Sequence, residues 1–178
     1  MPTSDLASGG RYSAATDRWA SMATNGAPTG RRGHVVAWTG TEILIWGGTG
    51  SRGIGLASGD RYDPVTDRWA PLPDVGAPPS NGLSAVWTSA GWFVWSGRNG
   101  RGARYAPADN AWRPVSATGA PTTSDSATVW TGSEVVVWGG SDASGERADG
   151  ARYDPMLDRW RAMSSVGAPV ARSRPGAV

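Results

Sequence analysis

The sequence of 178 residues contains no cysteine and no lysine, and it has a single histidine, His34. Without cysteine there are no disulfides, thiolate metal sites or cysteine nucleophiles, and without lysine there is no Schiff-base chemistry. No apolar run approaches the roughly 18 residues of a membrane span, and the first residues lack the charged and then apolar pattern of a signal segment. We therefore expect no membrane partner, and the cellular compartment stays open.

Positive charge is carried entirely by arginine. The 17 basic residues face 15 acids, which leaves a net charge of +2. The arginines recur along the chain, mostly beside aspartate or tyrosine, whereas nucleic acid is normally gripped by a clustered basic face. We therefore interpret most of them as structural partners of aspartates and rings, and we expect no nucleic-acid partner.

Tryptophan, glycine and proline are abundant, with 11, 26 and 13 copies, and much of this content belongs to one repeated pattern. The pattern is Arg-Tyr, an Asp-bearing turn, Trp, and then Gly-Ala-Pro. Its four copies are spaced 43 to 50 residues apart and begin at Tyr12, Tyr62, Tyr105 and Tyr153. Their tryptophans are Trp19, Trp69, Trp112 and Trp160. A period in this range indicates an array of supersecondary units.

Two further apolar runs lie between each Gly-Ala-Pro and the next Arg-Tyr. In the first full copy they are residues 35–38 and 43–48, and the runs are short, β-branched and aromatic, which predicts strands. They do not alternate apolar with polar residues, so both faces of each strand should be buried. Four-stranded sheets arranged radially and stacked face to face give that environment. We expect at least 12 strands and no helix longer than two turns.

The order of these features resembles the kelch repeat of β-propellers. A glycine pair follows an apolar strand, then come Tyr-Asp-Pro and Trp, and the resemblance covers nearly the whole chain. The second copy departs from it, with Ser96-Gly97 for the glycine pair and Tyr105-Ala106-Pro107 for Tyr-Asp-Pro. The resemblance implies an all-β, kelch-type β-propeller of four-stranded antiparallel blades, with the tyrosines and tryptophans packed between blades. The repeat positions that we expect to be structural are Tyr12, Trp19, Gly47, Gly48, Tyr62, Trp69, Tyr105, Trp112, Gly139, Gly140, Tyr153 and Trp160.

The repeats divide the chain into three full blades and a split fourth. Residues 1–29 supply strands three and four of a partial blade, residues 30–78, 79–121 and 122–169 are full blades, and residues 170–178 begin an innermost strand. Three interpretations stay open. The chain is an excised or engineered piece of a larger propeller, or two copies complete each other's open blade in a ring of about eight blades, or the chain forms a compact four-bladed monomer. We predict the homodimer, with residues 5–20 of one copy beside residues 168–178 of the other.

Few residues suggest chemistry. We expect no catalytic residue, no metal and no cofactor, because one histidine and three glutamates supply neither a triad nor a ligand cluster. The loops after each second strand should share one side of the ring, where arginines could recognise carboxylates or a protein. The candidate ligand or partner surface consists of Arg52, Arg98, Arg101, Arg147 and His34.

The expected function is therefore that of a non-catalytic propeller scaffold for protein interaction and self-assembly, with itself and an unknown protein as partners. One alternative is a module that binds a sugar or another small polar ligand in the propeller channel. A second alternative is a fragment of a propeller enzyme.

Overall fold

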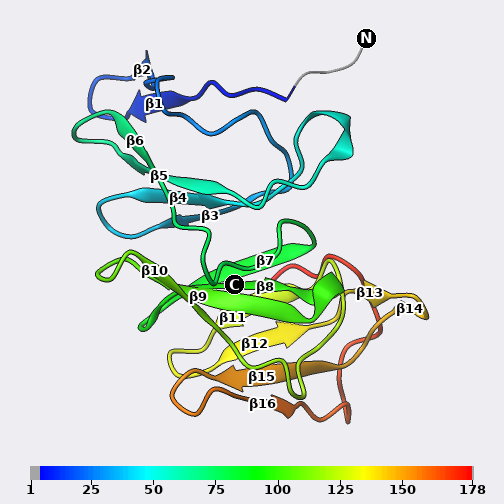
Figure 1. Ribbon diagram of the computed structural model, residues 1–178. Helices are drawn as coiled ribbons and strands as arrows, with labels where there is room; N and C mark the ends of the chain where they lie inside the picture. The colour runs from blue at the N-terminus through cyan, green and yellow to red at the C-terminus, as the bar shows by residue number, and fades with distance from the viewer. Residues whose placement is uncertain (1–4, 178) are drawn as a thin grey trace.

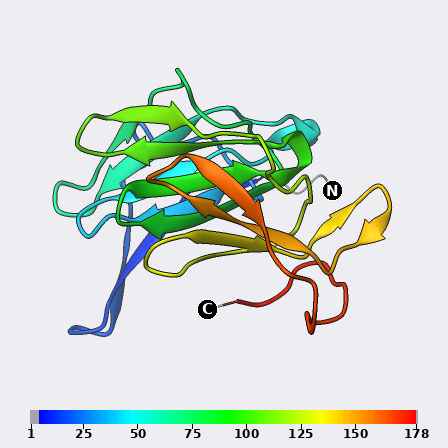
Figure 2. The ribbon, with the colours of Figure 1, turned by 90° about the horizontal axis from the view of Figure 1, so that it is seen from below.

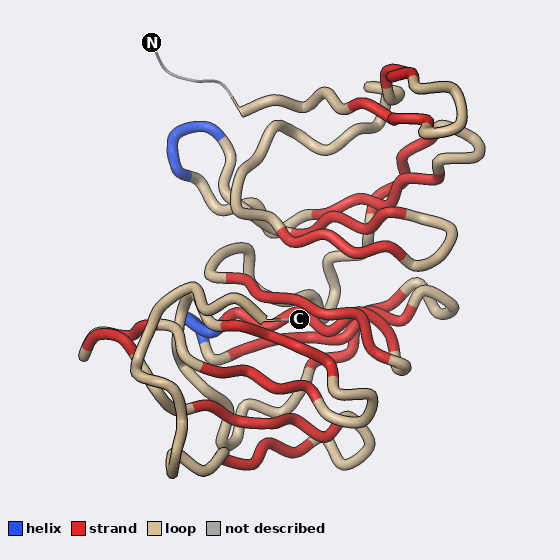
Figure 3. Tube along the Cα trace, turned by 180° about the vertical axis from the view of Figure 1, so that it is seen from behind, coloured by secondary structure: helices blue, strands red, loops and turns tan. Residues whose placement is uncertain are grey.

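The computed structural model describes residues 5–177, and this part of the chain is built from short strands joined by turns. Sixteen strands are present, together with two 3₁₀ segments, η1 (Ser51–Gly53) and η2 (Gly97–Asn99). No α-helix occurs in residues 5–177, and no helix in this part is long and apolar enough to cross a membrane. Figure 3 shows how little of the trace is helical.

Three four-stranded antiparallel sheets form the complete blades. Blade 1 contains β3 (Val35–Trp38), β4 (Ile43–Trp46), β5 (Gly59–Asp63) and β6 (Arg68–Pro71). Blade 2 contains β7 (Leu83–Thr88), β8 (Gly91–Ser96), β9 (Arg101–Ala106) and β10 (Ala111–Pro114). Blade 3 contains β11 (Ala127–Trp130), β12 (Val135–Trp138), β15 (Gly150–Asp154) and β16 (Arg159–Ala162). In each blade the strands pair in chain order, as predicted for the four runs of the repeat.

Two hairpins complete the strand inventory. The half-blade at the N-terminal end is the pair β1 (Gly10–Ser13) and β2 (Arg18–Ser21), which correspond to strands three and four of a blade. A small hairpin, β13 (Ser141–Asp142) with β14 (Gly145–Glu146), stands in the loop between β12 and β15. The sequence predicted a loop there and not this hairpin.

The blades follow one another along an open arc. The inner strands β3, β7 and β11 lie side by side, and the β1–β2 hairpin and β16 lie at opposite ends of the molecule (Figure 1). The same hairpin projects from the molecule in the view from below (Figure 2). Residues 5–177 therefore form an arc of three blades and a half-blade, not a closed four-bladed ring. The all-β propeller architecture with four-stranded antiparallel blades is confirmed.

The core consists of the two junctions between complete blades, and β8 contributes to both. Trp92 and Val94 face blade 1, where they pack with Leu44 and Trp46. Phe93 and Trp95 point the other way and pack against Val135, Val137 and Trp160 of blade 3. Since successive side chains of a strand point to opposite faces, an uninterrupted apolar strand is what a central blade requires.

A tyrosine–tryptophan–aspartate unit closes the outer hairpin of each blade. In blade 1, Tyr62 pairs with Trp69 across the hairpin, with ring centroids 4.8 Å apart, and its hydroxyl donates to Asp67 Oδ1 at 2.6 Å. The same bond at 2.7 Å joins Tyr12 to Asp17, Tyr105 to Asn110, and Tyr153 to Asp158. These four turn residues have φ between 47° and 54°, a left-handed conformation that aspartate and asparagine tolerate better than most residues.

The same unit joins successive blades. The Trp69 indole N–H donates to the carbonyl of Ala23, and Asp67 Oδ1 accepts the N–H of Ala23 at 3.0 Å. Trp160 and Asp158 make the same two bonds to Ser116.

Blade 2 departs from this arrangement. The residue equivalent to Ala23 and Ser116 is Pro73, which has no N–H to donate, and the acceptor position holds Asn110 instead of aspartate. The indole N–H of Trp112 is buried without a partner. Of the three complete blades, blade 2 alone lacks both the aspartate and the backbone donor that it would accept from.

Burial of the repeat aromatics follows the position of their blade in the arc. Trp112 and Trp160, which we expected between blades, are each 5% exposed there. Trp69 is only partly buried, because the half-blade covers its face with two strands. The expectation is wrong for Tyr12 and Trp19, which are 51% and 74% exposed because no preceding blade exists in residues 5–177.

Candidate interaction surfaces

The loops after each second strand share one side of the arc (Figure 1). Arg52 lies in η1 with φ 64°, Arg98 lies in η2, and Arg101 begins β9. All three side chains are exposed. Arg52 follows the second strand of blade 1, whereas Arg98 and Arg101 follow that of blade 2, so the three arginines come from two blades.

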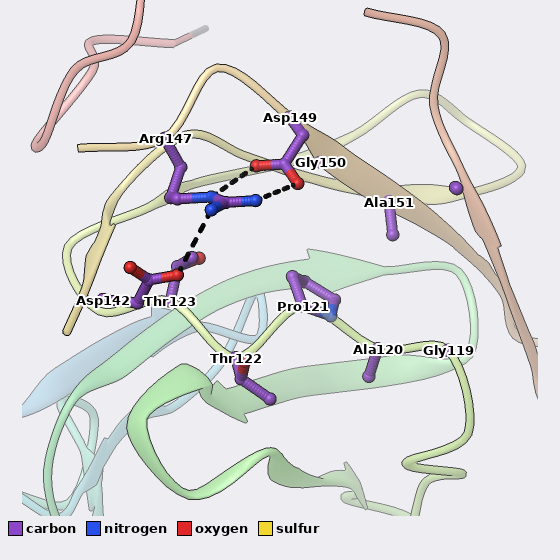
Figure 4. A pocket seen from close by; sticks show the side chains of 11 residues that line it. Gly119, Ala120, Pro121, Thr122, Thr123, Asp142, Arg147, Asp149, Gly150 and Ala151 are labelled. Carbon is purple, nitrogen blue, oxygen red and sulfur yellow. Dashed lines mark hydrogen bonds and ion pairs between the residues drawn. The ribbon is translucent and has the colours of Figure 1, made fainter. Parts of the chain in front are cut away.

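Arg147 lies in a pocket of about 240 Å³ between blades 2 and 3, with Pro121 and Thr122 on the opposite wall (Figure 4). It donates to both carboxylate oxygens of Asp149, at 2.9 and 2.8 Å. Its third nitrogen, Nη1, lies 3.6 Å from Asp142. The hydrogen bond from Arg147 lowers the pKa of Asp149, and the two carboxylates raise the pKa of Arg147. A ligand carboxylate would have to compete with both aspartates for this arginine.

His34 is half-buried at a second cavity, of about 260 Å³, between the β1–β2 hairpin and blade 1. Burial lowers the pKa of His34, and the charge of nearby Arg31 lowers it further, so the ring is neutral at pH 7. Its Nδ1 is buried without a hydrogen-bond partner. Within residues 5–177 no three metal-ligating side chains lie together, at His34 or elsewhere.

Sequence reasoning missed Arg31, which also lines this cavity. Arg31 is 9% exposed, and its guanidinium donates to the carbonyls of Gly47, Ser58 and Thr29. These bonds tie the start of blade 1 to the ends of β4 and of the loop before β5. No signal in the sequence distinguishes Arg31 from the exposed Arg32 beside it.

Each end of the arc exposes one side of a blade junction. Inside the arc, Trp46 contacts Trp112 at a centroid distance of 5.1 Å, and Trp95 contacts Trp160 at 4.9 Å. The equivalent of Trp46 and Trp95 in blade 3 is Trp138, and the equivalent of Trp112 and Trp160 in the half-blade is Trp19. The tryptophan pair formed at each of the two inner junctions is thus represented by one partner at each end, Trp138 at blade 3 and Trp19 at the half-blade.

The C-terminal segment covers part of the blade 3 face. We predicted that residues 170–178 begin an innermost strand, but no strand is present in residues 163–177, and Val178 lies outside the described residues. Gly140 N–H donates to the Arg172 carbonyl and Arg174 N–H donates to the Asp125 carbonyl. Ser173 donates twice to Glu146 of β14. A cavity of about 210 Å³ remains between this segment and Val129, Val136 and Trp138.

These contacts continue the repeat. Gly48 N–H donates to the Ser80 carbonyl, as Gly140 N–H does to Arg172, so the segment takes the place of the first residues of a following blade. Arg174 has φ 49°, like its equivalents Gly33, Gly82 and Asp125, which have φ between 57° and 65°.

Comparison with known families agrees with this geometry. Residues 30–76 match the family model of the Kelch motif. Residues 30–76 are thus a kelch motif. The matched residues are blade 1 with its preceding loop, and the other two blades repeat the same strand order.

The kelch blades also resemble a solved structure. The structure titled "Structure of YjhT" superposes with a TM-score of 0.66 and is 16% identical, which shows the fold alone. The match covers 88% of this chain and 58% of that one, so the chain spans little more than half the length of its structural neighbour. A comparison with curated proteins finds no match.

Proposed function

We propose that this chain is a non-catalytic kelch module whose blade faces bind protein, and that its own two open faces bind each other between copies. Kelch propellers present rigid blade faces and variable loops, which suits an interaction scaffold or binding module. The proposal depends most on Trp19, because a large aromatic with 74% exposure occupies the repeat position that is buried in blades 2 and 3.

The two open faces are complementary. Trp138 occupies the second-strand position, which inside the arc contacts a fourth-strand tryptophan of the next blade. Trp19 occupies that fourth-strand position. Packing the half-blade of one copy on blade 3 of another would repeat the junctions already made inside the chain. Each copy offers one face of each kind, so two copies related by a two-fold axis close a ring and do not grow into a fibre.

The C-terminal segment favours the same arrangement. Arg172 accepts the same kind of hydrogen bond as Ser80, which precedes the first strand of blade 2, and β1–β2 supplies strands three and four. A composite blade from two copies would therefore contain residues 175–177 of one chain and 10–21 of the other. Such a blade would still lack its second strand, so the edge of β1 would stay free.

Sedimentation velocity between 1 and 100 μM tests this proposal. We expect a species of twice 18.5 kDa to form with rising concentration, and Trp19→Ala to weaken the association at least tenfold. Val65→Ala is the matched control, because Val65 is 90% exposed but lies in the β5–β6 turn, away from both open faces. A wild-type chain that stays at 18.5 kDa at 100 μM would refute the proposal.

The pocket around Arg147 favours a second candidate function, the binding of a small polar ligand such as a sugar. Asp142, Asp149 and Thr122 line it with hydroxyl and carboxylate groups. The indole of Trp95 donates to the carbonyl of Pro121 in the pocket wall, so its emission should respond to an occupant. Saturable quenching by a sugar panel, lost in Asp149→Ala, would support this candidate, and no change with any sugar would count against it.

A further inference from the structure

The half-blade has a free edge on β1. In each complete blade the Arg-Tyr strand lies between the glycine-pair strand and the tryptophan strand. Within residues 5–177, β1 pairs with β2 alone. The second edge of β1 therefore has backbone donors and acceptors that are not paired with another strand in residues 5–177. Extended peptides add a strand to edges of this kind.

A glycine in the third strand of each blade indicates which kind of strand fits this edge. Three residues before each repeat tyrosine stands a glycine that lies opposite a tryptophan of the second strand. These pairs are Gly59 with Trp46, Gly102 with Trp95, and Gly150 with Trp138.

The glycine is required by both the backbone and the indole of the strand across from it. A Cβ on Gly59 would clash with the carbonyl oxygen of Ile45 and lie 2.6 Å from Cε3 of Trp46. A Cβ on Gly102 would lie 2.5 Å from Cε3 of Trp95 and equally close to the Val94 carbonyl oxygen. Real Cβ atoms do not approach other atoms so closely. A larger residue at this position would therefore displace the second strand together with its tryptophan.

The half-blade has the same glycine. Gly9 stands three residues before Tyr12, at an exposed position. A Cβ on Gly9 would meet only the side chain of Met22, with its sulfur at 2.8 Å. The half-blade thus keeps the space for an indole, and the flexible Met22 side chain lies across it.

A cavity lies beside this glycine. Gly9 and Met22 line the space of about 260 Å³ together with Ile43, Ile45 and Trp69 of blade 1. In the two complete junctions, the equivalents of Trp69 contact an indole from the second strand of the preceding blade. Trp69 itself contacts only the ring of Tyr62 among the described aromatics. The cavity is lined mainly by apolar side chains, with Arg31 and His34 also in its wall, and it lies where that indole would pack.

The backbone fixes the register. In blades 1 and 3 the glycine after the second-strand tryptophan donates to the residue before strand three, Gly47 to the Ser58 carbonyl at 3.0 Å and Gly139 to the Asp149 carbonyl at 2.9 Å. The equivalent carbonyl of the half-blade belongs to Ser8, which also lines the cavity. A strand with its tryptophan across Gly9 would place its next N–H against Ser8.

We propose that the free edge of β1 is a strand-acceptor site for an extended partner segment of the form apolar-x-Trp-Gly. The segment pairs antiparallel with residues 8–12 and inserts its tryptophan across Gly9 into the cavity against Trp69. Met22 swings away to admit the indole, which its flexible thioether side chain allows. The site is separate from the face-to-face association proposed above, because it uses the edge of β1 and not the exposed side of Trp19.

A synthetic peptide tests the site. The probe is a fluorescently labelled peptide with the sequence of residues 133–141 (SEVVVWGGS) and two added arginines at each end for solubility. We expect saturable binding to the 178-residue protein by fluorescence anisotropy, and at least tenfold weaker binding of the same peptide with its tryptophan replaced by alanine. Hydrogen exchange should report new protection at the amides of Gly10 and Tyr12.

The decisive variant is Gly9→Val, which should weaken peptide binding at least tenfold because its side chain fills the indole space. Ser21→Val places the same side chain at an exposed position on β2, away from the free edge, and should bind as the wild type does. Equal binding to Gly9→Val and wild type, equal binding of the two peptides, or no binding at 1 mM would each overturn the proposal. Gly9→Val should leave the sedimentation of the protein unchanged, which separates this site from self-association.

Discussion

Replacing Trp112 with alanine should lower the free energy of unfolding by about 3–5 kcal/mol, the range for deleting a large buried aromatic side chain. The side chain is 5% exposed. Its ring lies 5.1 Å from Trp46, 5.9 Å from Trp92 and 5.2 Å from Tyr105. Aromatic pairs of this kind contribute about 0.5–1.5 kcal/mol each beyond the buried area, so we expect the upper half of the range.

Two further variants separate the contributions. The indole N–H of Trp112 has no partner, whereas that of Trp160 donates to the Ser116 carbonyl at 2.8 Å. Trp160 is equally buried and also contacts three rings, so Trp160→Ala should cost about 1 kcal/mol more than Trp112→Ala, the net value of one hydrogen bond. Trp19→Ala is the control, since a side chain that is 74% exposed should change the stability by about 0.5 kcal/mol or less in the monomer.

Guanidinium denaturation followed by far-UV circular dichroism measures these differences, because tryptophan emission would change with the mutations themselves. The curves should be recorded at two protein concentrations, so that any contribution from association appears as a shift of the midpoint with concentration. If Trp112→Ala moved the midpoint no further than Trp19→Ala, the placement of this tryptophan at the heart of the blade 1–2 junction would be wrong.

Three other predictions concern the turn residues and His34. Hydrogen bonds from Tyr62 and from a backbone N–H lower the pKa of Asp67. The ionised carboxylate therefore stabilises the folded protein above the unfolded pKa of about 3.9, and this stabilisation is lost as pH falls through the folded pKa. Asp67→Asn should lower the denaturation midpoint at pH 7, and this difference from the wild type should shrink below about pH 4. Pro73→Ala combined with Asn110→Asp should create the interblade bond that blade 2 lacks, seen as a favourable coupling of about 0.5–1.5 kcal/mol in a double-mutant cycle, and additive single effects would contradict it. The purified protein should carry no stoichiometric copper, zinc or iron, and one equivalent by elemental analysis that is lost in His34→Ala would show otherwise.

The strand order of the blades was predictable from the sequence because each strand and turn of the repeat is specified by residues close together in the chain. The runs at 43–48 and 135–140 end in glycine pairs, and Gly47 and Gly48 adopt φ of 71° and 88°, which disfavour any side chain. The continuous apolar character of 92–95 also has a local cause, since that strand has a complete blade on each side. Glycine pairs at the turns and uninterrupted apolar runs in the doubly buried strands can therefore be recognised in the sequence.

Features that depend on which neighbour is present were not predictable. Trp19 and Trp112 occupy the same position in the repeat, yet one is exposed and the other is buried, because burial depends on the preceding blade. The partners of Arg147 come from residues close in sequence, but no rule of spacing distinguishes them from other Arg–Asp neighbours. The space left by Gly9 beside β1 was also not predictable, because only the structure of the complete blades shows that the equivalent glycines accommodate a second strand and its tryptophan.

The bonds that join successive blades also bear on how the chain folds. Trp69 reaches back 46 residues to Ala23, and Trp160 reaches back 44 residues to Ser116. Each junction therefore closes a loop of about one repeat, whatever the position of the blade in the arc. Because the entropy of closing a loop depends on its length, every blade that docks meets nearly the same barrier, and growth of the arc proceeds by nearest-neighbour steps. Folding should then begin at the most apolar junction, around β8, and spread outward one blade at a time.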